Sequence, residues 1–145
     1  ADALHLLGPN MLEGVDVTTV CLTPHEGELA KLCDAFGVSA DGKLARTRRL
    51  RDVTGMTVLA KGPDTILASD VMTQFFPRGS SWLSVAGTGD VLAGIVASRL
   101  AVHGDPQRAC VEGVWLHLEA ARIASPAFSA GDLAHAVKPA MASFL

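Results

Sequence analysis

One carboxylate, Asp90, directly follows a short glycine-containing stretch, Gly87-Thr88-Gly89, and precedes an apolar run typical of a helix. The two glycines allow the backbone to turn tightly and to approach a ligand closely. The first turn of a helix carries unpaired N–H groups and a partial positive charge, so it favours an anion such as a phosphate. An acid at that place fits a general base that takes a proton from a hydroxyl attacking phosphorus. The pattern indicates phosphoryl transfer to an alcohol.

A simpler interpretation of Asp90 also stands. Aspartate is a common N-cap residue, and a plain helix cap after a glycine turn would explain the same four residues. On spacing alone the cap is slightly favoured, because a short Gly-x-Gly-Asp is a weak signal.

A second polar stretch, Thr23-Pro24-His25-Glu26-Gly27-Glu28, follows a strand expected over residues 15–22. Open α/β sheets place their ligands at the carboxyl ends of strands, so His25 could donate a hydrogen bond to a substrate oxygen or phosphate. Thr23 and Glu26 have the spacing of a capping box, which is their simpler interpretation.

Glu28 in the same stretch could be a functional acid, a metal-linked carboxylate or half of a helix-start cap. Its simpler interpretation is an acid on the surface of a helix. A third stretch, Lys61-Gly62-Pro63-Asp64-Thr65, also follows an expected strand. Lys61 could reach a nucleotide phosphate there, with Gly62 leaving room for it. Taken alone, an exposed hairpin tip with a solvated lysine explains this stretch as well.

The elements that must position these residues follow from hydrophobic periodicity and from turn and cap signals. Strands are expected over residues 15–22, 57–60, 65–68 and 72–76. Helices are expected over residues 26–36, from a cap at Ser39 or Asp41 to about residue 53 and Gly55, over residues 89–102 and 105–124, and from about residue 132. Residues 57–60 and 65–68 should pair as a hairpin. The order of one strand, two helices, three strands and then only helices predicts a layered α/β domain.

Composition narrows the class of protein. The chain has 145 residues, the size of one domain, and with 49% apolar and 19% charged residues it is not expected to be disordered. A net charge of −3 gives no electrostatic reason to expect nucleic acid or membrane as a partner. No apolar run reaches the about 18 residues of a membrane-spanning helix.

The cysteines and histidines give no metal or disulfide signal. Cys21, Cys33 and Cys110 are widely spaced among apolar residues, which predicts buried free thiols in a reducing compartment and a cytoplasmic protein. No His, Cys or carboxylate set has the spacing of a transition-metal site, so no metal ligand is assigned. His117 lies on an apolar helix and is expected to be a packed residue with its hydrogen bonds satisfied.

The three stretches in this order resemble the ADP/ATP-dependent NAD(P)H-hydrate dehydratases of the ribokinase-like superfamily. The matching patterns are Thr-Pro-His-x-Gly-Glu, Lys-Gly-x-x-Thr and Ala-Gly-Thr-Gly-Asp-Val-Leu-Ala-Gly-Ile, and the first is the one more specific to the dehydratases. Asp2-Ala3-Leu4 is similar to the end of an Asp-Ala-Asp-Ala-Leu stretch of the family, and Gly113-Val114-Trp115-Leu116-His117 resembles its late helix.

The resemblance implies a lyase that repairs nicotinamide cofactors. A nucleotide, ADP or ATP, would phosphorylate the hydroxyl of hydrated NADH or NADPH, and loss of phosphate would restore the cofactor. Asp90 would be the catalytic base, and His25 and Asp90 would face the hydrate. The adenine nucleotide would be contacted by two loops, the first formed by Lys61, Gly62, Pro63, Asp64 and Thr65 and the second by Gly87, Thr88 and Gly89. Mg²⁺ would be bound to its phosphates. The family tends to form homo-oligomers.

The family domain is longer, so residues 1–145 are expected to be the C-terminal portion of a single ribokinase-like domain, incomplete because its N-terminal strands and helices are missing. The missing half would then be a partner. Two other functions stay open: a vitamin-precursor kinase of the same superfamily, which would stop at the phosphorylated alcohol, and a non-catalytic nucleotide-binding fragment.

Overall fold

The computed structural model describes residues 2–144, and the chain divides into two units, Ala1–Pro77 and Arg78–Leu145. All strands found in the described residues lie in the first unit: β1 (Cys21–Leu22), β2 (Thr57–Ala60), β3 (Ile66–Ala68) and β4 (Thr73–Phe75). They form one sheet in the order β1-β2-β3-β4, with β1 parallel to β2 and the other pairs antiparallel. The expected hairpin around residues 61–65 and the α/β class are both confirmed.

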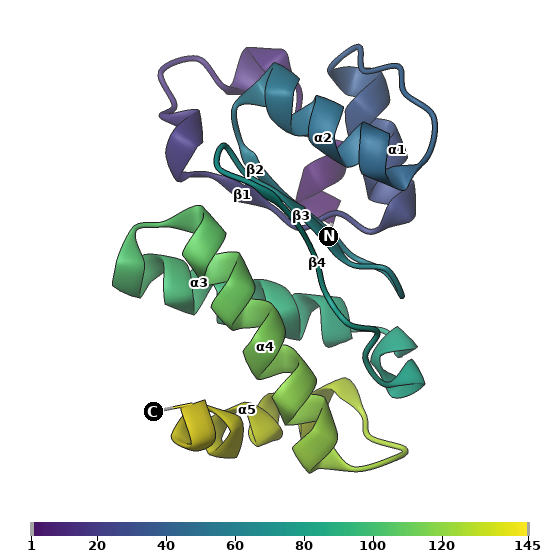
Figure 1. Cartoon of the computed structure of the whole chain (residues 1–145), viewed down its shortest axis with the longest axis vertical. Helices are drawn as coiled ribbons and strands as arrows, with labels where there is room; N and C mark the ends of the chain where they lie inside the picture. The colour runs from purple at the N-terminus through teal and green to yellow at the C-terminus, as the bar shows by residue number, and fades with distance from the viewer. Residues whose placement is uncertain (1, 145) are drawn as a thin grey trace. The chain divides into compact units, whose positions relative to one another are not determined.

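Two helices, α1 (Glu26–Ala35) and α2 (Lys43–Thr54), connect β1 to β2 and lie on the same side of the sheet (Figure 1). Leucines from both helices and apolar residues around β2 form a buried core, which includes Leu29, Leu32, Leu50, Met56 and Val58. Both helices were predicted, and α2 ends, as expected, at Gly55, whose φ of +73° suits a glycine.

The expected strand over residues 15–22 is wrong for most of its length. Only Cys21–Leu22 is a strand, and Val17–Thr19 forms a 3₁₀ turn, η3. The cause is Asp16, whose carboxylate accepts hydrogen bonds from the Thr18 N–H at 3.1 Å and the Thr18 hydroxyl at 2.6 Å. A local side-chain bond of this kind competes with the extended conformation that the β-branched residues favour. Two further short 3₁₀ segments precede it, η1 (Asp2–His5) and η2 (Pro9–Met11).

The second unit is helical, with η4 (Ser81–Ser84), α3 (Thr88–His103), α4 (Pro106–Ala124) and α5 (Ala130–Phe144). The α4 helix lies beside both α3 and α5 (Figure 1). The Asp105 carboxylate accepts from the Arg108 N–H at 3.1 Å and caps α4 as predicted. The α5 helix begins two residues before the expected Asp132. No helix among the described residues is long and apolar enough to cross a membrane.

One glycine lets α3 and α4 approach closely. A Cβ at Gly113 of α4 would lie 2.6 Å from Cγ2 of Val96 on α3. His117 lies one turn further along α4 and shares this face, because residues four apart in a helix are neighbours. The close approach at Gly113 therefore brings His117 towards the beginning of α3.

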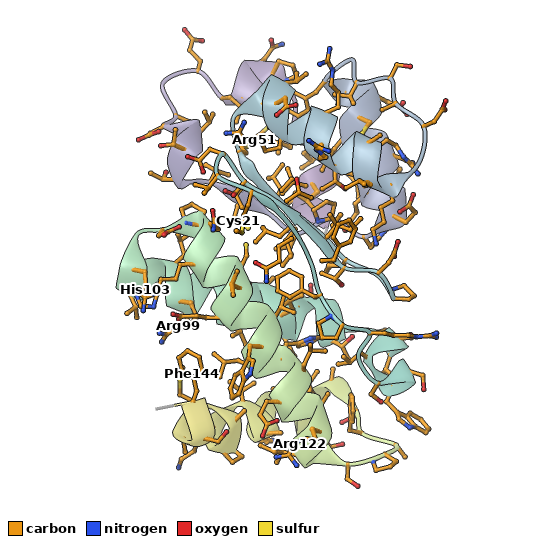
Figure 2. The ribbon with its side chains drawn as sticks, viewed as in Figure 1. Cys21, Arg51, Arg99, His103, Arg122 and Phe144 are labelled. Carbon is orange, nitrogen blue, oxygen red and sulfur yellow. The ribbon has the colours of Figure 1, made fainter. Side chains whose placement is uncertain are left out.

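An ion network joins the other end of α3 to α4. Glu112 accepts hydrogen bonds from Arg99 at 2.7 Å and Arg108 at 2.8 Å, and His103 Nε2 lies 2.9 Å from the same carboxylate. Figure 2 labels Arg99 and His103 near the C-terminal end of α3. Burial raises the pKa of Glu112, but the hydrogen bonds from the two arginines and His103 outweigh it and lower this pKa to about 2. Glu112 therefore keeps its negative charge at neutral pH, and its contacts with Arg99 and His103 link α4 to α3.

The packing at Gly113 gives a first prediction. Gly113→Ala forces Val96 or the α4 backbone to move, so the free energy of unfolding should fall by about 1–3 kcal/mol, as for other overpacked cores. Gly94→Ala on α3 is the matched control, because a Cβ at Gly94 meets no atom within 4 Å. Replacing this helical glycine should leave stability unchanged or raise it by up to about 1 kcal/mol. Urea unfolding measures both, and equal stabilities would contradict the packing argument.

Candidate functional site

The turn before α3 is held from within. Gly87 is the N-cap with a φ of +89°, in the left-handed region, and makes no side-chain cap. A Cβ at Gly87 would lie 3.0 Å from the Ala130 Cβ. Thr88 follows it and is only 3% exposed. The Thr88 hydroxyl lies within hydrogen-bond distance of two carbonyl oxygens of the turn, 2.6 Å from Leu83 O and 2.8 Å from Val85 O. The turn is therefore a rigid support for the residues that follow.

Gly89 and Asp90 occupy the second and third positions of α3. Within residues 2–144 the Gly89 N–H donates to no acceptor, and the Asp90 carboxylate, on an exposed residue, has no hydrogen bond or ion pair. The interpretation of Asp90 as the helix cap is therefore wrong, because Gly87 occupies the N-cap position. What the geometry provides is an unpaired carboxylate beside an unpaired N–H at the positive end of a helix dipole.

The start of α5 shows what the same residues do with a different cap. Its first residues are Ala130-Gly131-Asp132, so Gly-Asp has the same position as in α3. Here Ser129 precedes the helix, and its N–H and hydroxyl donate to Asp132 Oδ2 at 2.9 Å and 2.7 Å. The backbone and hydroxyl bonds of Ser129 lower the pKa of Asp132. In α5 the Asp132 carboxylate therefore stabilises the start of the helix. The reciprocal hydrogen bonds of Ser129 and Asp132 also explain why α5 begins at Ala130, two residues before the predicted start.

His117 is buried, at 7% exposure, and its Nε2 lies 2.9 Å from the Thr88 carbonyl oxygen. The prediction of a packed histidine with a satisfied hydrogen bond is confirmed.

In the first unit, His25 is the N-cap of α1. Its Nδ1 accepts hydrogen bonds from the Gly27 N–H at 3.0 Å and the Glu28 N–H at 3.2 Å. The Glu28 carboxylate in turn accepts from the His25 N–H at 2.7 Å, which completes a capping box. The predicted box of Thr23 and Glu26 is wrong, because α1 begins two residues later than a cap at Thr23 requires. The interpretation of Glu28 as half of a helix-start cap is confirmed.

This cap decides which nitrogen of His25 can donate. Because Nδ1 accepts from two backbone N–H groups, the neutral ring carries its proton on Nε2. The side chain of His25 is 59% exposed, and Nε2 lies 3.6 Å from Glu28 Oε1. An N–H donor is thus held in a defined orientation at the start of α1.

Glu28 brings the second and third polar stretches together. It is 3% exposed, so its interpretation as an exposed helix acid is wrong, and its Oε2 lies 3.9 Å from Lys61 Nζ. The Lys61 side chain is itself only 18% exposed, so it is not a solvated hairpin tip. Burial raises the pKa of the Glu28 carboxyl, yet its hydrogen bonds, including that from the His25 N–H, and the Lys61 ammonium hold the pKa below its usual value.

The loop at residues 61–65 depends on Lys43, which the sequence analysis missed. Lys43 Nζ donates to the Lys61 carbonyl at 3.0 Å, the Asp64 carbonyl at 2.9 Å and Asp64 Oδ1 at 2.7 Å. These bonds use all three protons of the ammonium group. A Cβ at Gly62 would lie 2.6 Å from this nitrogen, so the glycine makes room for Lys43 itself. The available signal was a lysine at the first position of a helix, where the dipole disfavours a cation.

The other residues of the loop at 61–65 differ in their contacts. The Thr65 hydroxyl donates to the Gly62 carbonyl at 2.9 Å, and Pro63 lies exposed at the tip. The hydrogen bond from Lys43 lowers the pKa of Asp64. His25, Glu28 and residues 61–65 all lie in the first unit, and Gly87, Thr88, Gly89 and Asp90 in the second. No group of three potential metal-binding side chains occurs within the described residues.

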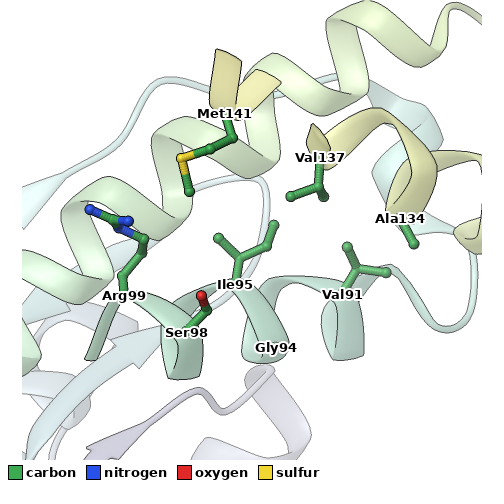
Figure 3. A pocket seen from close by; sticks show the side chains of 8 residues that line it. All are labelled: Val91, Gly94, Ile95, Ser98, Arg99, Ala134, Val137 and Met141. Carbon is green, nitrogen blue, oxygen red and sulfur yellow. The ribbon is translucent and has the colours of Figure 1, made fainter. Parts of the chain in front are cut away.

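A cavity of about 280 Å³ lies between α3 and α5 (Figure 3). Its lining is mostly apolar and comes from residues such as Val91, Ile95 and Arg99 of α3 and Ala134, Val137 and Met141 of α5. None of the candidate site residues lines it.

Comparison with known proteins establishes the family. The family model described as NAD(P)H-hydrate dehydratase matches residues 1–142, so the chain belongs to that family. An ADP-dependent (S)-NAD(P)H-hydrate dehydratase from Neisseria meningitidis is 37% identical over 97% of this chain and 50% of its own length. A bifunctional NAD(P)H-hydrate repair enzyme from Mycobacterium tuberculosis is 40% identical over 70% of this chain and 21% of its own. The chain thus spans half, or less, of these relatives.

Solved structures confirm the ribokinase-like fold. A ribokinase-like superfamily protein from Enterococcus faecalis superimposes with a TM-score of 0.80 at 22% identity, over 99% of this chain and 51% of that one. An ADP/ATP-dependent NAD(P)H-hydrate dehydratase from Bacillus subtilis, crystallised with ATP and Mg²⁺ and soaked with CoA, gives 0.74 at 25% identity, over 87% and 49%. Coverage of about half of each solved chain fits the expectation of an incomplete domain.

Lys43 gives a second prediction. Lys43→Met keeps most of the side-chain stem but removes the ammonium, so the free energy of unfolding at pH 7 should fall by about 1–3 kcal/mol. Because the Asp64 carboxylate is 66% exposed, its own share should be only about 0–1 kcal/mol. The contribution of the Asp64 carboxylate to stability is fully present above its pKa in the unfolded chain, about 3.9. It is lost as the pH falls through the lower pKa of Asp64 in the folded state.

The difference between wild type and Lys43→Met should therefore shrink from pH 7 to below pH 3 without vanishing, because the two carbonyl bonds do not titrate. Urea unfolding at several pH values measures it. Asp64→Asn is the control: it removes the titrating group and keeps an acceptor, so in that background the effect of Lys43→Met should not change with pH. A loss independent of pH in both backgrounds would contradict the assigned ion pair.

Proposed function

We propose that the protein containing this chain is an ADP- or ATP-dependent dehydratase that repairs hydrated NADH and NADPH. The observation that carries the proposal is the exposed, unbonded Asp90 carboxylate beside the unpaired Gly89 N–H in the first turn of α3. Membership in the NAD(P)H-hydrate dehydratase family and the names of the relatives support the substrate and the nucleotide.

In the proposed reaction, Asp90 takes the proton of the hydroxyl that hydration added to the nicotinamide ring. The freed oxygen attacks the terminal phosphorus of the nucleotide, and the bond from that phosphorus to the bridging oxygen breaks, releasing AMP from ADP or ADP from ATP. Elimination of the phosphate with a ring proton then restores the double bond. A general base of this kind contributes about 10²–10⁴ to the rate.

The residues around Asp90 suit this role. The Gly89 N–H and the helix dipole would attract the transferred phosphoryl group, and donors already in place need no rearrangement as its charge develops. Asp90 has no bond within the described residues to break before it accepts a proton. Gly89 has no side chain, so a ligand can approach its backbone N–H closely.

In the first unit, His25 would donate its Nε2 proton to the hydrate, and residues 61–65 would contact the adenine nucleotide. Mg²⁺ would bind to the phosphates of the nucleotide and neutralise part of their negative charge. We assign the ion no ligand from this chain. The ion pair of Lys43 with Asp64 supports the nucleotide assignment, because it removes the repulsion that an isolated carboxylate would exert on an anionic ligand.

The test uses the complete gene product that contains these residues, mixed with hydrated NADPH, Mg²⁺ and ADP or ATP. The return of dihydronicotinamide absorbance should depend on the nucleotide, and Asp90→Asn should lower its rate by about 10²–10⁴ while nucleotide binding persists. Asp132→Asn is the matched control, since it changes the aspartate at the same position of α5. It removes the charge from the cap but keeps an acceptor, so it should lower stability slightly and leave turnover nearly unchanged.

Three results would overturn the proposal. Phosphorylation of a vitamin-precursor alcohol without repair of the hydrate would identify a kinase of the same superfamily. Nucleotide binding without turnover of the hydrate or of any alcohol would indicate a non-catalytic nucleotide-binding protein. An Asp90→Asn variant with full activity would mean that Asp90 is not the base.

A further inference from the structure

We propose that His117 is a positioning residue for the reaction, acting through the peptide group between Thr88 and Gly89. The expected effect on catalysis rests on the proposed function. The hydrogen bond that would position the peptide group rests only on the geometry of the second unit. His117 itself is buried and reaches Thr88 O, on a residue 29 positions earlier in the chain.

The direction of the hydrogen bond is unambiguous. A carbonyl oxygen can only accept, so His117 Nε2 carries a proton and donates it to the Thr88 oxygen at 2.9 Å. The Thr88 carbonyl and the Gly89 N–H belong to one planar peptide group, and the described residues contain no cis peptide bond. In a trans peptide the oxygen and the amide hydrogen point in opposite directions. Holding the oxygen from α4 therefore sets the direction in which the Gly89 N–H points.

The rest of the turn helps His117 to fix the direction of the Gly89 N–H. The Thr88 hydroxyl is anchored on carbonyls of the preceding turn, so this residue is held through its side chain and its carbonyl oxygen together. Gly89 has no side chain to hold it, and it lies in the first turn of α3, where backbone N–H groups have no acceptor within the helix. Among the described residues, His117 is the donor that ties this peptide to another helix.

The same bond strengthens the donor. A hydrogen bond to a carbonyl polarises the amide, and chains of such bonds reinforce one another by about 10–30% per bond. The Gly89 N–H, without an acceptor in the described residues, would receive this gain when an anion binds. Because the contact is buried, it does not compete with water. The close approach of α4 at Gly113, one turn before His117, is what allows the imidazole to reach the first turn of α3.

The experiment compares His117→Leu with His117→Gln in the complete gene product. Leucine removes the donor, whereas the glutamine amide can donate a similar hydrogen bond. We expect His117→Leu to lower kcat by about 10- to 100-fold, less than the 10²–10³ typical of deleting an oxyanion-hole donor outright. The KM for the nucleotide should change little, and His117→Gln should recover most of kcat.

Val114→Ala is the matched control for a purely structural role. Val114 lies buried on the same helix, 4% exposed, and its truncation lowers stability without removing the bond to Thr88. At a temperature where all variants are folded, Val114→Ala should keep its kcat.

A second readout does not depend on activity. With ¹⁵N-glycine labelling, the Gly89 amide proton should shift upfield in His117→Leu and return towards its wild-type position in His117→Gln. If the wild type shows no dehydratase activity but this pattern of shifts is found, the proposed function fails and the positioning of the Gly89 peptide stands. Equal losses of kcat in the two variants, or an unchanged Gly89 resonance in His117→Leu, would overturn the inference.

Discussion

The residue that precedes each helix decides what the aspartate in its first turn can do. Both α3 and α5 begin with Gly-Asp at their second and third positions. Before α5, Ser129 offers a hydroxyl and an N–H, and Asp132 is bound to both. Before α3, Gly87 has no side chain and is in a left-handed conformation, so Asp90 stays unpaired. The chemistry proposed for Asp90 depends on this missing side-chain cap. A glycine in place of a capping side chain typically costs the helix only about a few tenths of a kcal/mol.

How far the sequence predicts this structure depends on the range of the interaction that decides each element. The hairpin of β2 and β3 and the start of α4 at Asp105 were predicted because turn and cap signals lie within a few residues of each other. The strand over residues 15–22 failed because one side chain, Asp16, bonds locally and overrides the β-branched pattern. At α1 the sequence indicated Glu28 as a possible cap partner but placed the main capping box two residues early, at Thr23, since histidine is not an expected N-cap residue.

The missed parts of the candidate site come from long-range contacts. Lys43 and Asp64 are 21 residues apart, and Thr88 and His117 are 29 apart. Taken singly, a histidine on an apolar helix is an ordinary residue, and a lysine at the first position of a helix indicates only an unfavourable place in the dipole, not a partner. Their roles become visible only when the fold brings each one to a particular carbonyl group. Resemblance to the family identified the loops, but the family patterns do not include the residue, Lys43, that holds the loop at residues 61–65.

The same kind of interaction occurs separately in each unit. In both, a side chain on a helix donates to backbone carbonyls of a proposed binding loop: Lys43 to Lys61 and Asp64, and His117 to Thr88. Carbonyl oxygens repel anions, whereas N–H groups attract them. When protein donors hold the carbonyls, the loop cannot turn these oxygens towards a phosphate, and its N–H groups keep their orientation before the ligand arrives. Such preorganisation lowers the cost of binding and favours the developing charge of a transition state.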